Sequence, residues 1–408
     1  MANVSSSNGL EKRPKLRFPG FDEPYRSTQL GDIAALVNRT DPKSNAPIMM
    51  LSAGNGFIMQ SEKYSRDNAG QSLKKYILLK QGELAYNHGA SKAKQFGCCY
   101  ELTEPEARIP YVYHCFKINN HEYTPFIAMA LNNAQMDKQL KRLVSSSVRM
   151  DGLLNISFED YMSVTIHLPS PSEQKRIADF LQKIDERIAA QEKLLAFLKK
   201  YKRGVVRTLL TPDSCCIAGA TWTTAKIGDL GSFTKGAPLS KADIAPDGTP
   251  FILYGELYTT YHEVINAVIR RTHAQPEKQY YSRVGDVIIP TSGETPEEIS
   301  TAACVMLPDI ILAGDLNIFR SSKIDGRIMS YILNHIVSGQ IARIAQGKSV
   351  VHIQANELSK IEISYPDYNT QRKMIKIFDA LNARTEIAQK KLMALRCIQK
   401  ALLQQLFI

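Results

Sequence analysis

The sequence has no stretch of about 18 consecutive apolar residues, so no membrane-spanning helix is expected. The first residues also lack the apolar core of a signal peptide, and we read them as a short flexible lead of a cytoplasmic protein. The seven cysteines include two adjacent pairs, Cys98-Cys99 and Cys215-Cys216, but no C-x-x-C pair. An odd number of cysteines without a secretion signal indicates reduced thiols, and their spacing predicts no metal site.

Motifs for catalysis are also missing. No Asn/Asp-Pro-Pro-aromatic motif for base methylation occurs, and the eight His residues form no H-x-x-x-H pattern. Residues 342–349 resemble a relaxed phosphate loop, but the expected order of strand, loop and helix is reversed there. Glu173 and Lys175 have nuclease-like spacing without an upstream acidic partner, while His167 and His352 alternate with apolar residues as on a strand. We therefore predict a non-enzymatic chain.

The sequence does contain a long internal repeat, offset by 197 residues. Residues 166–210 are similar to residues 363–407, Leu30-Gly31-Asp32-Ile33 to Ile227-Gly228-Asp229-Leu230, and Tyr25 to Trp222. A repeat of this length is too large for a solenoid unit, so it indicates a duplicated domain with a connector. The hydrophobic content of 44% and charged content of 22% are typical of a globular protein.

Most of the net charge of +11 lies in the two most similar segments. Residues 166–211 hold ten Lys or Arg against five Asp or Glu, and residues 363–408 hold eight against three. A basic chain favours a nucleic-acid partner, although a solvated helical face would look the same.

Both repeated segments are predicted to be long helices, because apolar residues recur in alternating steps of four and three. Ser172 is the expected cap of the first helix, and Asn369 or Thr370 that of the second. The predicted coiled-coil seam consists of Ile177, Leu181, Ile184, Ile188, Leu195, Leu198, Val205, Leu209, Met374, Phe378, Leu381, Leu392, Leu395, Leu402 and Leu406. Polar residues interrupt it at the same rung in both repeats, at Lys202 and Gln399.

The matched heptads favour two helices packed on each other over two helices that pack separately on their own domains. From Ile177 to Leu209 the first helix would span about 48 Å, or about 14 base pairs of duplex. If the helices run antiparallel, they would hold two similar surfaces at a fixed separation.

Each large unit is predicted to be mixed α/β. In the second, we expect strands at residues 225–230, 251–254, 284–290, 316–320, 350–353 and 361–364, and a helix at 329–337. In the first, we expect the corresponding turn and strand at 81–86, a helix at 126–134 and final strands at 156–166.

The first repeated helix resembles the conserved region of type I restriction–modification specificity subunits. The matching residues are Pro171, Glu173, Gln174, Ile177, Ala178, Ile184, Asp185 and Gln191. The second helix departs from this pattern, with Thr370-Gln371 for Glu-Gln and Leu381-Asn382 for Ile-Asp. The runs PKLRFPGF…QLGDI and TWTTAKIGDLGSF resemble the starts of the two target-recognition domains.

This resemblance implies an α/β fold of two duplicated target-recognition domains, joined by two helices in an antiparallel coiled coil with pseudo-two-fold symmetry. The implied boundaries are 1–165 and 212–362 for the recognition domains and 166–211 and 363–408 for the helical spacers. The chain would read a bipartite, asymmetric sequence in double-stranded DNA and dock two methyltransferase subunits, which are joined by restriction subunits. S-adenosylmethionine, ATP and Mg²⁺ would bind to those partners, and this chain would carry no cofactor of its own.

Candidate DNA contacts are basic or small polar side chains in loops or beside the predicted helices. They are Asn87, Ser91, Lys92, Lys94, Lys141, Arg142, Ser146 and Arg149 in the first domain, and Lys235, Ser240, Lys241, Arg343, Lys348 and Ser349 in the second. A different class of function stays open: a coiled-coil assembly scaffold without DNA readout.

Overall fold

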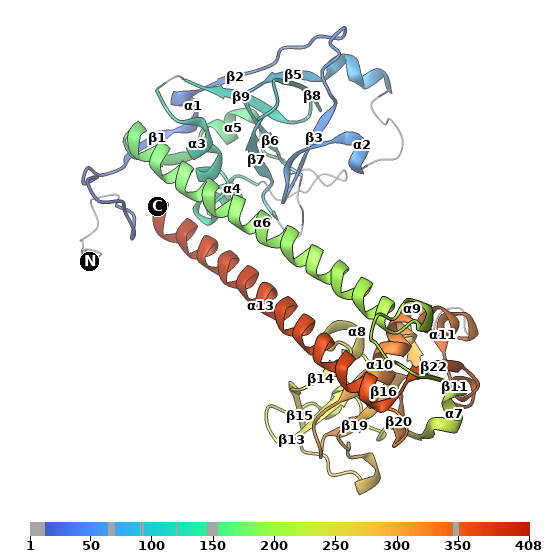
Figure 1. The fold of residues 1–408 in the computed structure, drawn as a ribbon. Helices are drawn as coiled ribbons and strands as arrows, with labels where there is room; N and C mark the ends of the chain where they lie inside the picture. The colour runs from blue at the N-terminus through green and yellow to red at the C-terminus, as the bar shows by residue number, and fades with distance from the viewer. Residues whose placement is uncertain are drawn as a thin grey trace. The chain divides into compact units, whose positions relative to one another are not determined.

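The computed structural model describes residues 13–63, 70–89, 91, 94–119, 121–144, 154–345 and 351–408. The chain divides into two compact units, which we call unit 1 (residues 1–191 and 391–408) and unit 2 (residues 192–390). Each unit therefore contains one end of each of the two long helices, α6 (Pro171–Leu209) and α13 (Tyr368–Leu406), drawn in green and red in Figure 1. The predicted domain boundaries, which set the helices apart as segments of their own, stay predictions.

Unit 1 is built around a four-stranded antiparallel sheet of order β2-β9-β6-β7. The strands of unit 1 as a whole are β1 (Arg26–Gln29), β2 (Ala34–Leu36), β3 (Met49–Ser52), β4 (Gly56–Met59), β5 (Ile77–Lys80), β6 (Leu84–Asn87), β7 (Cys98–Glu101), β8 (Glu106–Ile109), β9 (His114–Ile118) and β10 (Thr165–Leu168). Its other helices are α1 (Leu30–Ile33), α2 (Gln60–Lys63), α3 (Thr124–Ala130), α4 (Ala134–Leu143), α5 (Phe158–Met162) and the 3-10 turn η1 (Gly70–Lys75). Phe126 and Ile127 of α3 bury against Leu84 and Phe116 of this sheet.

Unit 2 has a five-stranded sheet of order β12-β20-β16-β18-β14 and a three-stranded sheet of order β15-β13-β19. Its strands are β11 (Trp222–Lys226), β12 (Gly231–Lys235), β13 (Thr249–Leu253), β14 (Val264–Ile265), β15 (Arg270–Thr272), β16 (Asp286–Pro290), β17 (Ser292–Gly293), β18 (Ala303–Val305), β19 (Ile311–Ala313), β20 (Leu316–Ser321), β21 (Val351–His352) and β22 (Glu362–Pro366). Its shorter helices are α7 (Ile227–Leu230), α8 (Glu256–Thr259), α9 (Pro296–Ile299), α10 (Gly326–His335), α11 (Ser338–Ile344) and α12 (Ala355–Ser359), with 3-10 turns η2 (Pro212–Ser214), η3 (Lys241–Asp243) and η4 (Lys278–Tyr280).

The two units repeat the same frame at the offset found in the sequence. In unit 1, Gln29 of β1 lies opposite Thr165 of β10; in unit 2, Lys226 of β11 lies opposite Glu362 of β22. Both positions of the second pair are 197 residues beyond those of the first. The strand order β2-β9-β6-β7 likewise recurs as β12-β20-β16-β18. The prediction of two duplicated mixed α/β domains is thus confirmed.

A buried glutamine of each long helix ties that helix to its own unit. In unit 1, Gln174 accepts a hydrogen bond from the backbone N–H of Tyr123 at 2.9 Å, just before α3, and donates to the Pro169 carbonyl at 3.0 Å. Gln371 does the same in unit 2 with Asp325, just before α10, and with Pro366. This shared role explains why glutamine stands at both positions although its neighbour changes from Glu173 to Thr370.

The long helices are packed together and run antiparallel. In unit 1, Ile177 and Leu181 near the start of α6 share a buried cluster with Leu406 at the end of α13. In unit 2, Val206 and Leu209 near the end of α6 share a cluster with Phe378 near the start of α13. All 15 predicted seam residues are buried or half-buried.

Three local predictions were wrong. Residues 227–230 form the helical turn α7, not a strand, because Ile227 and Leu230, three residues apart, are both buried on one side of a turn. Phe158–Met162, expected within strands, is the helix α5, since Ser157 and Asp160 form a capping box. The lead is anchored from residue 13 onward: Leu16 donates to the Gln405 carbonyl at 3.0 Å, and Arg17 forms two hydrogen bonds with Glu173.

The predicted caps of the long helices also need correction. Helix α6 begins at Pro171, so Ser172 lies inside its first turn. Helix α13 begins at Tyr368, and the residue that accepts from its first turn is Asp367, whose carboxylate takes the Thr370 N–H at 3.1 Å. Proline at the first helical position and aspartate just before it are both favourable there, because the first N–H groups have no partner inside the helix.

Candidate nucleic-acid interface

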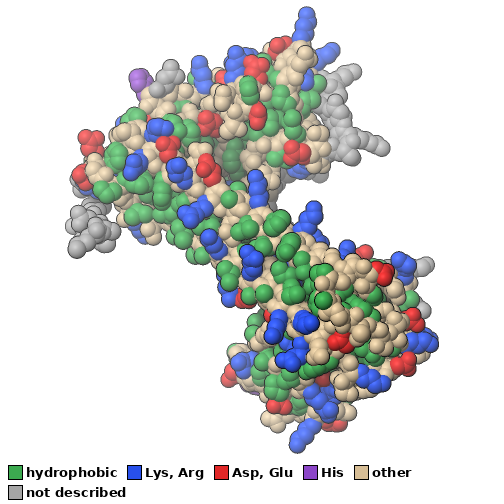
Figure 2. Space-filling model, viewed as in Figure 1, with side chains coloured by type: hydrophobic (Ala, Val, Ile, Leu, Met, Phe, Trp, Pro, Cys, Tyr) green, Lys and Arg blue, Asp and Glu red, His purple; other side chains and the backbone are tan. Residues whose placement is uncertain are grey.

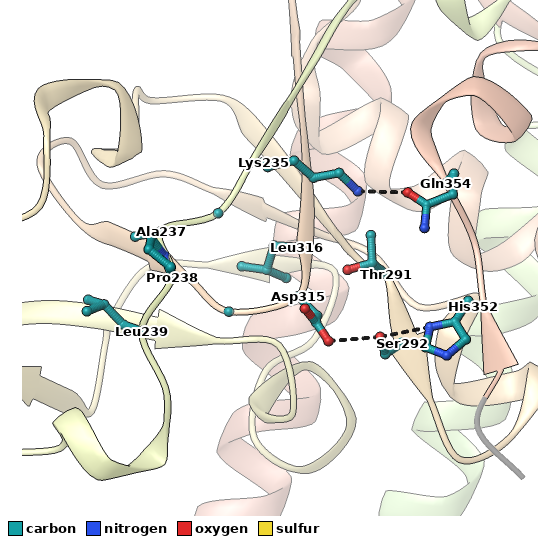
Figure 3. A pocket seen from close by; sticks show the side chains of 12 residues that line it. Lys235, Ala237, Pro238, Leu239, Thr291, Ser292, Asp315, Leu316, His352 and Gln354 are labelled. Atoms are coloured by element: carbon teal, nitrogen blue, oxygen red, sulfur yellow. Dashed lines mark hydrogen bonds between the residues drawn. The ribbon is translucent and has the colours of Figure 1, made fainter.

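Polar side chains at or beside the ends of four strands of unit 2 line a cleft with a volume of about 480 Å³ (Figure 3). Lys235 ends β12, Ser292 starts β17, Asp315 precedes β20, and His352 ends β21. Gln354 follows β21 and lies beside Lys235 in Figure 3. Because strand ends bring these residues together, their side chains are held on a rigid frame.

Lys235 is held in place by a chain of hydrogen bonds that starts in the core. The fully buried Asn317 donates from Nδ2 to the Ile353 carbonyl at 3.2 Å, and its Oδ1 accepts from the Lys235 ammonium at 3.0 Å. Lys235 also donates to Gln354 Oε1 at 3.1 Å. Burial lowers the pKa of Lys235, and the nearby charge of Asp315 opposes this effect.

Ser292, Asp315 and His352 form a second polar group on the opposite wall. Ser292 Oγ lies 2.9 Å from an Asp315 carboxylate oxygen and 3.1 Å from His352 Nδ1. A hydroxyl can donate one hydrogen bond, and Ser292 donates it to Asp315, so Nδ1 of His352 is the donor in its contact with Ser292 Oγ. In a serine hydrolase the histidine would take the serine proton and the carboxylate would bind the other ring nitrogen. The arrangement here is therefore unsuited to activate the serine.

A larger cleft of about 970 Å³ adjoins the first and shares Leu239, Ser292, Gly314 and Asp315 with it. Ser240 and Lys241 line its rim. Ser240 also caps the turn η3 through a hydrogen bond from the N–H of Ala242. The structure thus brings three predicted contacts, Lys235, Ser240 and Lys241, to one continuous hollow of unit 2.

In unit 1, Asn87 ends β6, and Ser91 and Lys94 lie between β6 and β7. Asn87 accepts from the Gly89 N–H at 2.9 Å, and Ser91 and Lys94 bond each other's backbone. The Lys94 ammonium donates to the Asn132 carbonyl at 2.9 Å, so it contributes to the local fold.

The other candidates of unit 1 and the C-terminal candidates of unit 2 are not brought together by any contact that the structure describes. Lys141 and Arg142 are exposed in the last turn of α4, and Arg343 is exposed on α11. Lys92, Ser146, Arg149, Lys348 and Ser349 lie outside the described residues.

Sequence reasoning missed Asp315, Ser292 and Gln354, which come from separate strands and loops. His352 was expected to be either a strand-surface residue or a core histidine, and it is an exposed residue at the end of β21. Alternation in residues 350–353 was the one signal that placed His352 near a strand. Glu173, considered for its nuclease-like spacing, is fully buried and paired with Arg17 at 2.7 Å, so it has a structural role.

The polar rung of the helix seam has a different partner in each unit. In unit 2, the Lys202 ammonium lies 2.8 Å from Glu263, whose other carboxylate oxygen lies 2.8 Å from His335 Nε2. In unit 1, Gln399 of α13 donates to Asp185 of α6. Burial alone would raise the pKa of Glu263, but the His335 hydrogen bond and the Lys202 charge outweigh it and lower the pKa to about 2.

The long helices also expose apolar side chains beside basic ones, as Figure 2 shows over their middle region. On α6, Leu194, Phe197 and Tyr201 are 46%, 61% and 50% exposed, and the last two rings stack with centroids 6.0 Å apart. We call these three residues the aromatic stripe. Spacings of three and four residues place them on one helical face.

Within the described part of the chain, no group of three or more His, Cys, Asp and Glu side chains is placed to hold a metal ion. None of the helices found there is long and apolar enough to cross a bilayer.

Comparison with known proteins gives a consistent picture. The family model described as "Type I restriction modification DNA specificity domain" matches twice, over residues 25–200 and 220–396. The S subunit of a type I restriction-modification system from M. genitalium has a similar fold, with a TM-score of 0.60, 16% identity, and coverage of 97% of this chain and 99% of that one. A structure described as underlying complex assembly and conformational transition of the type I R-M system matches with a TM-score of 0.56 and 16% identity, over 96% of this chain and 98% of that one. Among proteins with curated descriptions, none matches.

Proposed function

Since this chain belongs to the type I restriction-modification DNA specificity family, we propose that its two units each read one half of a bipartite DNA target. The chain is a non-catalytic subunit that recognises DNA within a restriction–modification complex. Two copies of one frame, each with its own surface, suit a target of two different halves. The observation that carries this proposal is the repeat of the frame at a constant offset of 197 residues, including the register of β1 with β10 and of β11 with β22.

The two units agree closely in their frame of strands and helices but differ in their surfaces. The paired strands and the buried glutamines recur position by position. By contrast, the smaller sheets differ: unit 1 pairs β3 with β4 and β5 with β8, whereas unit 2 has a three-stranded sheet β15-β13-β19 and a polar cleft around Lys235 and Asp315. Divergent surfaces on one frame are expected when each unit binds a different sequence.

The packed helices would set the distance between the two half-sites. Each has 39 residues, or about 58 Å at 1.5 Å per residue. Antiparallel packing places the start of α6 and the end of α13 in unit 1, and the reverse ends in unit 2. A spacer of fixed length predicts a target with a gap of fixed length.

The helices would also dock two methyltransferase subunits, which would bind S-adenosylmethionine, while restriction subunits would supply ATP- and Mg²⁺-dependent activity. The aromatic stripe supports this role, because exposed aromatic and apolar side chains gathered on one face mark sites of protein contact. On α13, Ile387, Met393 and Ile398 are likewise 51–65% exposed. Such surfaces in a basic helix fit a partner that covers them.

Binding of the assembled complex to duplex DNA tests the proposal against an assembly scaffold that does not read DNA. Fluorescence anisotropy would be measured between about 50 and 200 mM salt, where phosphate contacts make the logarithm of the association constant fall linearly with the logarithm of salt. We expect this fall for the complex. Salt-independent partner binding with no DNA binding would favour the scaffold.

A further inference from the structure

We propose that the cleft lined by Lys235, Asp315 and Gln354 is where unit 2 reads a guanine·cytosine pair through the major groove. The inference rests on the proposed function, in which unit 2 reads one half of the target. It adds which kind of base pair this cleft accepts and which side chains determine the choice.

One wall of the cleft presents hydrogen-bond donors. An ammonium group can only donate, so Asn317 and Gln354 must both turn their amide oxygens towards Lys235, at 3.0 and 3.1 Å. Asn317 is locked in this orientation because its Nδ2 donates to Ile353. Lys235 then keeps one N–H for a ligand. Gln354 turns its amide oxygen to Lys235, so its amide nitrogen points away from Lys235 (Figure 3). The Lys235 ammonium and the Gln354 amide nitrogen are therefore two neighbouring donor groups.

The opposite wall presents acceptors. One oxygen of Asp315 accepts from Ser292, and the carboxylate is exposed at the shared edge of both clefts. His352 donates from Nδ1 to Ser292 and so helps to hold the hydroxyl that donates to Asp315. Figure 3 shows Asp315, Ser292 and His352 together, apart from the Lys235–Gln354 pair.

Two adjacent donors beside an acceptor match one base pair better than the other. In the major groove, guanine offers two neighbouring acceptors, N7 and O6, and its cytosine offers the N4 amino donor. An adenine·thymine pair alternates acceptor, donor and acceptor. Lys235 and Gln354 would face the guanine, and Asp315 would accept from the cytosine amino group.

A phosphate would be a poor occupant of the same cleft. Its negative charge would meet the Asp315 carboxylate, and the adjoining cleft carries both signs, with Glu294 and Glu298 beside Lys241 and Arg270. A carboxylate is useful against a base edge, where cytosine N4 donates, but it repels a phosphate. The mixed lining therefore favours base reading over backbone contact.

The test uses the full chain in complex with its methyltransferase partner, expressed in cells whose methylome is sequenced. We compare the wild type with Lys235→Gln, Asp315→Ala and the donor-preserving Lys235→Arg. The control is Thr234→Ala. Thr234 is the exposed neighbour of Lys235 in β12, and its side chain points to the opposite face of the strand. Thermal unfolding of each purified complex identifies variants that fail to fold.

We expect the wild-type motif to contain a fixed guanine·cytosine pair in one half. Lys235→Gln and Asp315→Ala should each lower discrimination at that one position by about 10- to 100-fold, the range of a good bidentate base contact. Lys235→Arg should retain guanine there, and Thr234→Ala should leave the whole motif unchanged. Asp315 is exposed, so its variant carries the test even if a Lys235 variant unfolds.

Two results would overturn the inference: a folded Asp315→Ala complex with an unaltered motif, or a loss of discrimination spread over the whole half-site. If the wild-type motif is bipartite, neither of these two results would contradict the proposed function. A wild-type motif without two parts would instead contradict the proposed function itself.

Discussion

Gln371 of the second long helix accepts a hydrogen bond from the backbone N–H of Asp325 at 2.9 Å, at the start of α10. Gln174 repeats this bond with Tyr123 in the other unit. In both cases a buried amide joins a long helix to the first turn of the helix that covers the sheet. The position of that helix on its sheet is therefore coupled to the spacer.

Replacing Gln371 with Ala should destabilise unit 2 by about 2–4 kcal/mol, because the Asp325 N–H and the Pro366 carbonyl lose their buried partner. Trp222 is the only tryptophan and lies in β11 of unit 2, so its fluorescence in urea reports on this unit. Arg372→Ala, at the exposed neighbouring position, is the control. A loss below about 0.5 kcal/mol, the range of surface substitutions, would contradict the role of Gln371.

Glu263 should make unit 2 sensitive to acid. Its pKa is lowered to about 2 in the folded state, against about 4.3 in an unfolded chain. A carboxyl group whose pKa is lowered by folding stabilises the folded state fully above its unfolded pKa. This stabilisation is lost as the pH falls towards the pKa of the folded state. We expect on the order of 3 kcal/mol to be lost between about pH 5 and pH 2.

The measurement is urea unfolding at several pH values in that window, followed by Trp222 fluorescence. Glu263→Gln should be less stable than the wild type at pH 7, because Lys202 is then left half-buried without its carboxylate. Its stability should also vary less between pH 5 and pH 2. Parallel pH profiles for the two proteins would show that Glu263 is not the responsible group.

The aromatic stripe should be required for partner binding and not for folding. Phe197→Ser with Tyr201→Ser should weaken binding of the methyltransferase subunit by at least about 30-fold, since large exposed aromatics are frequent interface hot spots. Titration calorimetry measures the affinity, and Lys200→Ser, at an exposed position of the same helix, is the control. Unchanged affinity in the double variant would place the dock elsewhere.

Sequence periodicity predicted the helices and their seam well, because a heptad pattern is local information. It also located the polar rung at Lys202 and Gln399, but not the partners, Glu263 and Asp185, which lie 61 and 214 residues away. The repeat revealed Gln174 and Gln371 as equivalent, yet their bonds to Tyr123 and Asp325 depend on tertiary packing.

The cleft of unit 2 was only partly predictable for the same reason. Lys235 was predicted as a DNA contact from its type and position. Asp315, Ser292 and Gln354 carry no local motif, and strand pairing alone brings them to Lys235. In unit 1, the candidates Lys92, Ser146 and Arg149 lie outside the described residues and stay predictions, as do Lys348 and Ser349.

The helices should act as a ruler for the target. One heptad added to α6 and one to α13 at the same level of the seam lengthens each by about 10 Å, which corresponds to about three base pairs. The gap in the methylated sequence should widen by that amount, while the two half-sites stay the same. A gap of unchanged length would refute the ruler.

The central claim is that one chain reads two separate sequence elements at a fixed distance. Single-molecule methylome sequencing of cells that express this chain with its methyltransferase partner tests it most directly. The expected result is a single motif with two short elements separated by a gap of constant length and unspecified sequence. A contiguous motif, or no motif at all, would contradict the account.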